Sequence, residues 1–172
     1  MKFRDLRADE IECRVSTCSQ KGVSLLLYKD ARCDMNILDE TVGPMNWQRS
    51  HSRENANCIV SIWDESKKMW IAKEDTGTES YTEKEKGLAS DSFKRACFNW
   101  GIGRELYTAP RIWVSANDGN VTMENKNGKW STYDKFRVQQ IIIENKRIVA
   151  LAIKNDSLGK LVFMSDMREN NK

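Results

Sequence analysis

The stretch from Glu83 to Trp100 constrains the fold most, because it is the longest segment with helical periodicity and β-like segments flank it on both sides. At about 100° per residue its apolar side chains fall on one stripe, which holds Ala89, Phe93, Ala96, Cys97 and Trp100. The opposite side holds Lys84, Gly87, Asp91, Lys94, Arg95 and Phe98. Such a helix packs on a sheet through its apolar stripe and presents the other side to solvent or to a ligand.

The segments around this helix read mainly as strands. Before it, the residue pattern predicts strands over 23–28, 47–53, 58–63 and 69–75, and helices over 3–12 and 31–42. After it, the pattern predicts a strand over 112–114, a polar loop over 118–128, a hairpin of 136–144 with 147–154, and an edge strand over 161–163. We therefore expect an α+β fold, with an antiparallel β-meander packed on a long helix and a small C-terminal β extension. The 172 residues fit one domain over 1–163 and a flexible tail over 164–172.

The cysteine and histidine content argues against a metal site and against a disulfide framework. The chain has five cysteines, an odd number with no C-x-x-C pair, and His51 is its single histidine. No apolar run approaches the roughly 20 residues of a membrane span, and the first residues lack the apolar core of a signal peptide. We therefore expect a cytoplasmic protein with no metal, no cofactor and no membrane partner.

The distribution of charge points to a polyanionic partner. The formal net charge is +3, yet acidic residues outnumber basic ones over 1–83, and basic residues outnumber acidic ones over 84–111 and 125–172. A polyanion would be attracted to the later part of the chain. A net charge of this size is ordinary, so charge alone does not identify DNA as the partner.

Three short stretches carry a resemblance to a known family. They read GPMNW over 43–47, KEDTG over 73–77 and ASDSFKRA over 89–96. In this order they resemble the Rad-fifty-two family of single-strand annealing proteins. In that family a Glu-Asp-x-Gly strand end precedes a helix with a Ser/Thr-Asp-x-hydrophobic-Lys-Arg-Ala core. The residues over 91–107 are similar to the phage and prophage branch. The resemblance covers roughly 1–109, which would form the family-like core, and leaves 110–163 as the β extension.

The resemblance implies a fold, an assembly and an activity. Family members form rings or filaments of identical subunits, and single-stranded DNA lies in a positive groove around the ring. The implied function is binding of single-stranded DNA and ATP-independent annealing of complementary strands in phage homologous recombination and repair. The implied partners are single-stranded DNA, further copies of the chain and a phage single-strand binding protein, within the cytoplasm of a bacterial host. No catalytic residue is implied, so we expect no enzyme.

The resemblance also implies which basic residues contact DNA. The Lys-Arg pair that lines the groove corresponds to Lys94 and Arg95. A lysine of an outer DNA site corresponds to Lys68, and Arg104 is placed to reach a phosphate or an acidic group of a neighbouring subunit. The full predicted set is Lys94, Arg95, Arg32, Lys68, Lys84 and Arg104.

Several positions depart from the family pattern. The arginine that begins the family's second helix aligns with Cys33, although Arg32 is adjacent. The further arginine after the Lys-Arg pair is Phe98 here, which removes a phosphate contact or replaces it with a stacking contact. The aromatic residue after the first glycine of the 43–47 stretch is Pro44.

Aromatic side chains add stacking to single-strand sites, at roughly 1–3 kcal/mol per base. The sequence does not tell which aromatic residues stack on bases, and Tyr81, Tyr107 and Phe98 are the better candidates for exposure. The tryptophans of the predicted strands and of the apolar stripe are expected in the core, namely Trp47, Trp63, Trp70 and Trp100.

Other classes of function fit less well. A nuclease would need a metal-binding E-x-K arrangement, and the two stretches that spell it, 65–67 and 144–146, fall in predicted turns. The chain has no G-x-x-x-x-G-K-[ST] phosphate loop, which argues against ATP use. A coating protein of the OB-fold type and a recombination mediator without annealing activity stay open as alternatives. The long helix argues against the first, and the short tail argues against the second.

Overall fold

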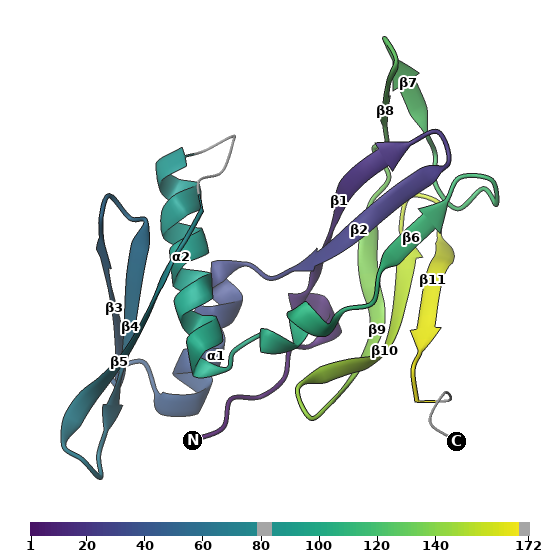
Figure 1. The fold of residues 1–172 in the computed structure, drawn as a ribbon. Helices are drawn as coiled ribbons and strands as arrows, with labels where there is room; N and C mark the ends of the chain where they lie inside the picture. Colours follow the sequence, from purple (N-terminus) through teal and green to yellow (C-terminus); the bar gives the residue numbers. More distant parts are fainter. Residues whose placement is uncertain (79–83, 169–172) are drawn as a thin grey trace. The chain divides into compact units, whose positions relative to one another are not determined.

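The computed structural model of this chain describes residues 1–78 and 84–168, and the side chains of 84–86 also lie outside the description. The chain divides into two compact units (Figure 1). Unit 1 contains Met1–Asp5 and Asp30–Arg104, and unit 2 contains Leu6–Lys29 and Glu105–Lys172. No helix in the described ranges is long and apolar enough to cross a membrane.

Unit 1 contains a three-stranded antiparallel sheet and two helices. The strands follow chain order, as β3 (Trp47–Ser52), β4 (Asn57–Asp64) and β5 (Met69–Thr76), and the helices are α1 (Ala31–Val42) and α2 (Lys84–Trp100). Asp64 forms the turn between β4 and β5, because its carboxylate accepts the backbone N–H groups of Ser66 and Lys67. Asp30 begins α1 by accepting the N–H groups of Arg32 and Cys33.

The core of unit 1 lies between α2, β4 and β5. The buried residues of α2 recur at helical spacing and are Leu88, Ser92, Phe93, Ala96 and Cys97. The Phe93 ring stacks on Trp47 with 6.1 Å between ring centroids. Trp100 donates its indole N–H to the Val60 carbonyl at 3.0 Å. The apolar stripe predicted for this helix is therefore the side that meets the sheet.

Unit 2 is built around a six-stranded antiparallel sheet. Its strands run in the order β11-β10-β9-β1-β2-β6, and the two edge strands β11 and β6 also approach each other, so the sheet is nearly closed. The bounds are β1 (Glu12–Ser19), β2 (Gly22–Tyr28), β6 (Ile112–Ser115), β9 (Phe136–Glu144), β10 (Arg147–Asn155) and β11 (Lys160–Asp166). Smaller elements are the 3-10 turns Ala8–Glu10 and Arg104–Thr108 and the hairpin of β7 (Glu124–Lys126) and β8 (Lys129–Ser131).

The predicted fold class is wrong. The described part of the chain is mostly β, and its largest element is the nearly closed six-stranded sheet rather than a long helix on a meander. The strands after residue 110 are no small extension, because β9 pairs with β1 and β6 pairs with β2. The helix predicted over 3–12 is a single turn over Ala8–Glu10, and the loop predicted over 118–128 contains β7.

Candidate nucleic-acid interface

The two motifs KEDTG and ASDSFKRA pack against each other at the end of β5. The Arg95 guanidinium lies beside the Asp75 carboxylate, with 3.5 Å between Nε and Oδ1. One residue beyond Gly77, the backbone N–H of Thr78 donates to Asp91 at 2.9 Å. Asp91 therefore fixes the chain after β5. The motif spacing reflects the docking of a strand end on a helix.

Gly77 allows this close approach. A Cβ at position 77 would lie 2.6 Å from the backbone nitrogen of Ser92 and 3.1 Å from the Leu88 carbonyl oxygen. Ser92 is itself fully buried and donates its hydroxyl to the Asn55 carbonyl at 2.9 Å. Because the obstructing atoms belong to the helix backbone, they cannot move aside as a flexible side chain would.

Replacing Gly77 with alanine is therefore expected to lower the free energy of unfolding by about 1–3 kcal/mol, the typical cost of overpacking. Urea titration monitored by tryptophan fluorescence would measure the loss. Thr78→Ala is the matched control, because Thr78 is exposed and its backbone N–H keeps the shorter bond to Asp91, while only the 3.4 Å bond from the hydroxyl is lost. Equal unfolding midpoints for Gly77→Ala and the wild type would contradict the close docking of β5 on α2.

Lys94 and Arg95 differ in how much of their charge is engaged. The Arg95 side chain is 40% exposed and faces Asp75, and its Nε has no hydrogen-bond partner within the described ranges. Lys94 is half-buried, and among the described residues its ammonium takes part in no ion pair or hydrogen bond. Among the predicted site residues whose side chains the structure describes, Lys94 is therefore the one whose charge is least neutralised.

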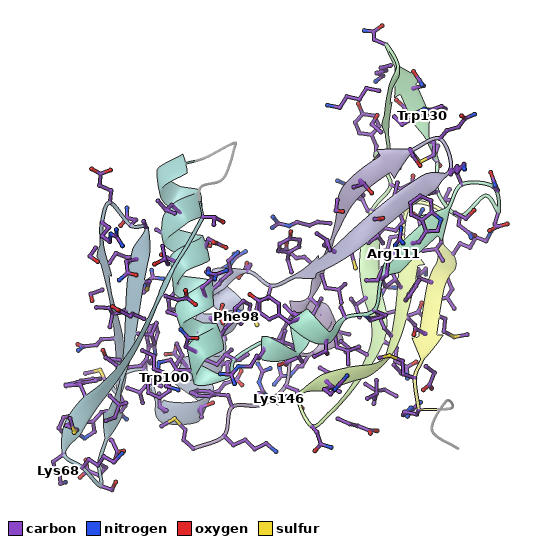
Figure 2. All side chains as sticks on the ribbon, in the orientation of Figure 1. Lys68, Phe98, Trp100, Arg111, Trp130 and Lys146 are labelled. Atoms are coloured by element: carbon purple, nitrogen blue, oxygen red, sulfur yellow. The ribbon has the colours of Figure 1, made fainter. Side chains whose placement is uncertain are left out.

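Two other predicted residues, Arg32 and Lys68, lie in exposed ion pairs. Arg32 binds Asp30 with 2.7 Å between Nη2 and Oδ2, and this contact lowers the pKa of Asp30. Lys68 lies in the β4–β5 turn, which Figure 2 shows at the end of that hairpin, and it pairs with Glu65. Exposed ion pairs contribute little free energy, so each cation can exchange its carboxylate for a phosphate at small cost.

Arg104 has a structural role that the sequence did not predict. Its Nε and Nη2 donate to the Phe98 carbonyl at 3.0 and 2.7 Å, and Nη2 also donates to the Asn99 carbonyl at 3.2 Å. These carbonyls end α2, where cations are favourable. Gly101 and Gly103, with φ of 93° and 71°, turn the chain so that Arg104 reaches back.

The predicted residues come from different elements of unit 1. Lys94 and Arg95 lie in the middle of α2, Arg32 in the first turn of α1, Lys68 in a hairpin turn and Arg104 just after α2. Lys84 is the first residue of α2, and its side chain lies outside the described residues. Among the predicted residues whose side chains the structure describes, only Arg95 meets a residue of the other motif, which is Asp75.

Two cations beside α2 were missed. Arg49 lies over the Phe93 ring at 4.6 Å, and Lys73 lies over the Trp100 ring at 4.8 Å. Arg49 and Lys73 pair on either side of Val60, which is buried. Because cross-strand neighbours point to the same face of a sheet, the strand alternation around Val60 was the signal that placed both cations beside the helix.

A groove in unit 1 combines tryptophans with lysines. It has a volume of about 330 Å³, and its lining includes Trp63, Trp100, Ile71, Lys67 and Lys73. Trp63 also meets Trp70 edge to face, with ring centroids 5.6 Å apart. Trp70 lies on the side of the sheet away from α2 and is 39% exposed. The prediction that Trp70 is in the core is therefore wrong. Apolar rings beside ammonium groups suit nucleobases and phosphates.

The remaining aromatic predictions had mixed outcomes. Tyr107 is 68% exposed, as expected, whereas Phe98 is half-buried. Tyr81 lies outside the described residues.

The two E-x-K stretches lie at turns, as predicted. Within the described ranges, no three His, Cys, Asp or Glu side chains gather as metal ligands would.

Comparison with known proteins finds two distant curated relatives. The chain is 30% identical over 96 residues to the single-stranded DNA-binding protein DdrA of Deinococcus radiodurans. The alignment covers 55% of this chain and 46% of that protein. It is also 30% identical over 106 residues to the protein of the same name from Deinococcus deserti. That alignment covers 60% of this chain and 52% of the relative. The chain thus spans about half the length of the curated relatives it matches. No family model and no solved structure matches it significantly.

Proposed function

We propose that this chain binds single-stranded DNA and anneals complementary strands without ATP. The observation that carries the binding proposal is the similarity to two proteins named as single-stranded DNA-binding, at 30% identity over more than half of the chain. The annealing activity, and a role in recombination and repair in a phage-infected bacterium, rest on the resemblance to the Rad-fifty-two family. The chain's own residues hold the DNA, and no catalytic group is required.

The cations around α2 support this proposal. Lys94 offers an ammonium without a carboxylate partner among the described residues, and Arg95 keeps part of its guanidinium exposed. Arg49 and Lys73 add positive charge beside the same helix. Lysine and arginine bind phosphates without reading sequence, and binding releases counterions from the DNA. Contacts to phosphates leave the base edges free, which annealing requires.

The three-stranded sheet of unit 1 supports assembly into a ring or filament. Within the three-stranded sheet, β3 and β5 are edge strands with unpaired backbone groups. Met69 and Trp70 of β5 are 50% and 39% exposed. Edge strands with exposed apolar residues favour pairing with another copy of the chain. Light scattering with and without DNA tests the assembly, and a monomer at micromolar concentration in both conditions would exclude it.

A Lys94→Ala variant tests the function at its central residue. We expect the variant to anneal complementary oligonucleotides more slowly in the absence of ATP. We also expect its log–log salt dependence of binding to be shallower by about 0.7, because each subunit loses one phosphate contact. Fluorescence anisotropy at several salt concentrations measures the slope, and duplex formation measures annealing.

Two controls isolate the charge of Lys94. Lys94→Arg keeps the charge and should retain the wild-type slope, whereas Lys129→Ala removes an exposed lysine of β8 outside the proposed site and should change neither readout. Arg95→Ala is less informative, because it also breaks the contact with Asp75. If Lys94→Ala stays assembled and anneals at the wild-type rate, Lys94 does not contact DNA.

Coating of single strands without annealing is the second candidate function. The sequence favoured a long-helix fold over a barrel, yet the sheet of unit 2 is nearly closed. Closed β-sheets are a common scaffold for single-strand binding. A protein that protects single strands from nuclease but does not accelerate duplex formation would support coating over annealing.

A further inference from the structure

The outward face of β2 and β6 in unit 2 carries exposed apolar and aromatic side chains. Val23, Leu25, Ile112 and Val114 are at most 2% exposed and form the inner face. Side chains alternate along a strand, so the residues between them point outward. Leu26 is 48% exposed and Trp113 is 37% exposed, and both lie on this outward side.

Two tyrosines extend the same surface. Tyr28 follows Leu26 by two residues on β2 and is 38% exposed. Tyr107, from the turn before β6, is 68% exposed. Leu26, Tyr107 and Arg111 line one shallow cavity of about 560 Å³. We call the outward face formed by Leu26, Tyr28, Tyr107, Arg111 and Trp113 the aromatic face.

Two arginines give the aromatic face its positive charge. Arg111, which Figure 2 labels at the start of β6, is exposed and has no ion pair or hydrogen bond among the described residues. Arg14 on β1 lies opposite Leu26 and places its guanidinium 5.1 Å from the centre of the Tyr28 ring. Glu12 is the neighbouring carboxylate and already binds Arg14 at 2.8 Å. Arg111 therefore keeps a charge that no neighbouring acid neutralises within the described ranges.

The backbone at Gly22 leaves room for the Trp113 ring. A Cβ at Gly22 would lie 2.1 Å from the Val114 carbonyl oxygen and 3.1 Å from the Trp113 ring. Gly22 has a φ of 145°, a conformation that other residues rarely adopt. The absence of a side chain at this position lets the Trp113 ring lie across β2.

We propose that the aromatic face is a second surface for single-stranded DNA, on which bases stack against Trp113, Tyr107 and Tyr28 while Arg111 and Arg14 bind phosphates. The inference rests on the proposed single-strand binding and adds a surface outside the residues that the family resemblance implied. Flat rings beside cations fit a polyanion with exposed bases, because stacking tolerates any sequence.

Tyr107→Ala and Tyr133→Ala form a matched pair for the test. Both tyrosines lie in unit 2 and are 68% exposed, but Tyr133 lies after β8, outside the aromatic face. We expect Tyr107→Ala to weaken binding of an oligothymidine about tenfold, with an unchanged salt slope, because one stacking contact is lost. Tyr133→Ala should bind like the wild type. Arg111→Gln should lower the salt slope by about 0.7.

Trp113→Phe is the control for Trp113→Ala. It keeps an aromatic ring, so it tests stacking even if the alanine variant fails to fold. We expect it to bind nearly as well as the wild type, whereas Trp113→Ala should bind about tenfold more weakly. Photo-crosslinking with 5-iodouracil oligonucleotides, followed by peptide mapping, should mark Tyr107 or Trp113.

The outcomes separate this inference from the proposed function. If the wild type binds single strands and Lys94→Ala weakens that binding, but the variants of the aromatic face bind normally without crosslinks, only the aromatic face is excluded. If these variants change the oligomeric state and leave affinity intact, the face contacts another copy of the chain and the inference is wrong. If the wild type does not bind single strands at all, the proposed function fails, and this inference fails with it.

Discussion

Phe93→Ala is expected to lower the free energy of unfolding by about 3–5 kcal/mol, the typical cost of removing a buried aromatic ring. The Phe93 side chain is fully buried in unit 1 and stacks on Trp47. It also supports the Arg49 guanidinium, which lies 4.6 Å from the ring centre. Because small proteins are stable by only about 5–15 kcal/mol, such a loss removes much of the stability. Urea denaturation would show a markedly lower midpoint.

Phe93→Leu is the control for this prediction. It fills part of the same volume and should cost clearly less than the alanine variant. If Phe93→Ala unfolds within about 0.5 kcal/mol of the wild type, the change resembles a surface substitution, and α2 does not pack on β3 through this ring.

The helices and strands of unit 1 were predictable because their patterns are local. The strands predicted over 47–53, 58–63 and 69–75 match β3, β4 and β5 to within one residue at each end, and 31–42 matches α1. In β4, buried Cys58, Val60 and Ile62 alternate along the strand. In α2, buried residues recur at helical spacing. Each pattern depends only on neighbours in sequence, which is what periodicity reports.

The sheet of unit 2 was predictable only in part. The strands predicted over 23–28, 112–114, 136–144 and 147–154 match β2, β6, β9 and β10 to within one residue at each end, but β1 and the pairing that joins these strands were missed. Residues 12–19 form β1, but none of them is buried, and the spacing of two between the apolar residues Cys13 and Val15 is lost at the bulge between Val15 and Thr17. Their place in the sheet depends on pairing with β2 and, through Glu12 and Arg137, with β9. The second pairing joins residues far apart in the chain. When the pairing partners determine where a strand lies, the residues of that strand alone do not predict it.

In the candidate site, too, some contacts could be predicted from local sequence patterns and others could not. Arg49 and Lys73 flank Val60 in the sheet, so strand alternation could have placed them beside the helix. Arg95 meets Asp75 only because β5 docks on α2, and Arg104 caps α2 only because glycines turn the chain back. These two contacts depend on tertiary geometry, which a residue pattern does not contain.

The affinity for single-stranded DNA is expected to fall about a hundredfold as salt rises from about 50 to 200 mM, because about five phosphate contacts at ~0.7 each give a log–log slope of about −3.5. The five cations are the predicted residues of unit 1 other than Arg104, namely Lys94, Arg95, Arg32, Lys68 and Lys84, and phosphate contacts of Arg111 and Arg14 would make the slope steeper still. Arg32 and Lys68 contribute because their present ion pairs are exposed and exchange readily for phosphate.

Arg104 is the sixth predicted cation, and we leave it out of the five phosphate contacts. Its guanidinium already donates to the carbonyls of Phe98 and Asn99 at the end of α2, so it has little to offer a phosphate. Arg104→Gln should therefore destabilise α2 and leave the salt slope near the wild-type value, whereas Arg32→Gln should make the slope shallower by about 0.7. Anisotropy titrations of an oligothymidine over the salt range measure both slopes. A nearly flat wild-type response would mean that phosphate contacts do not dominate binding, and a shallower slope for Arg104→Gln would show that DNA displaces the helix cap.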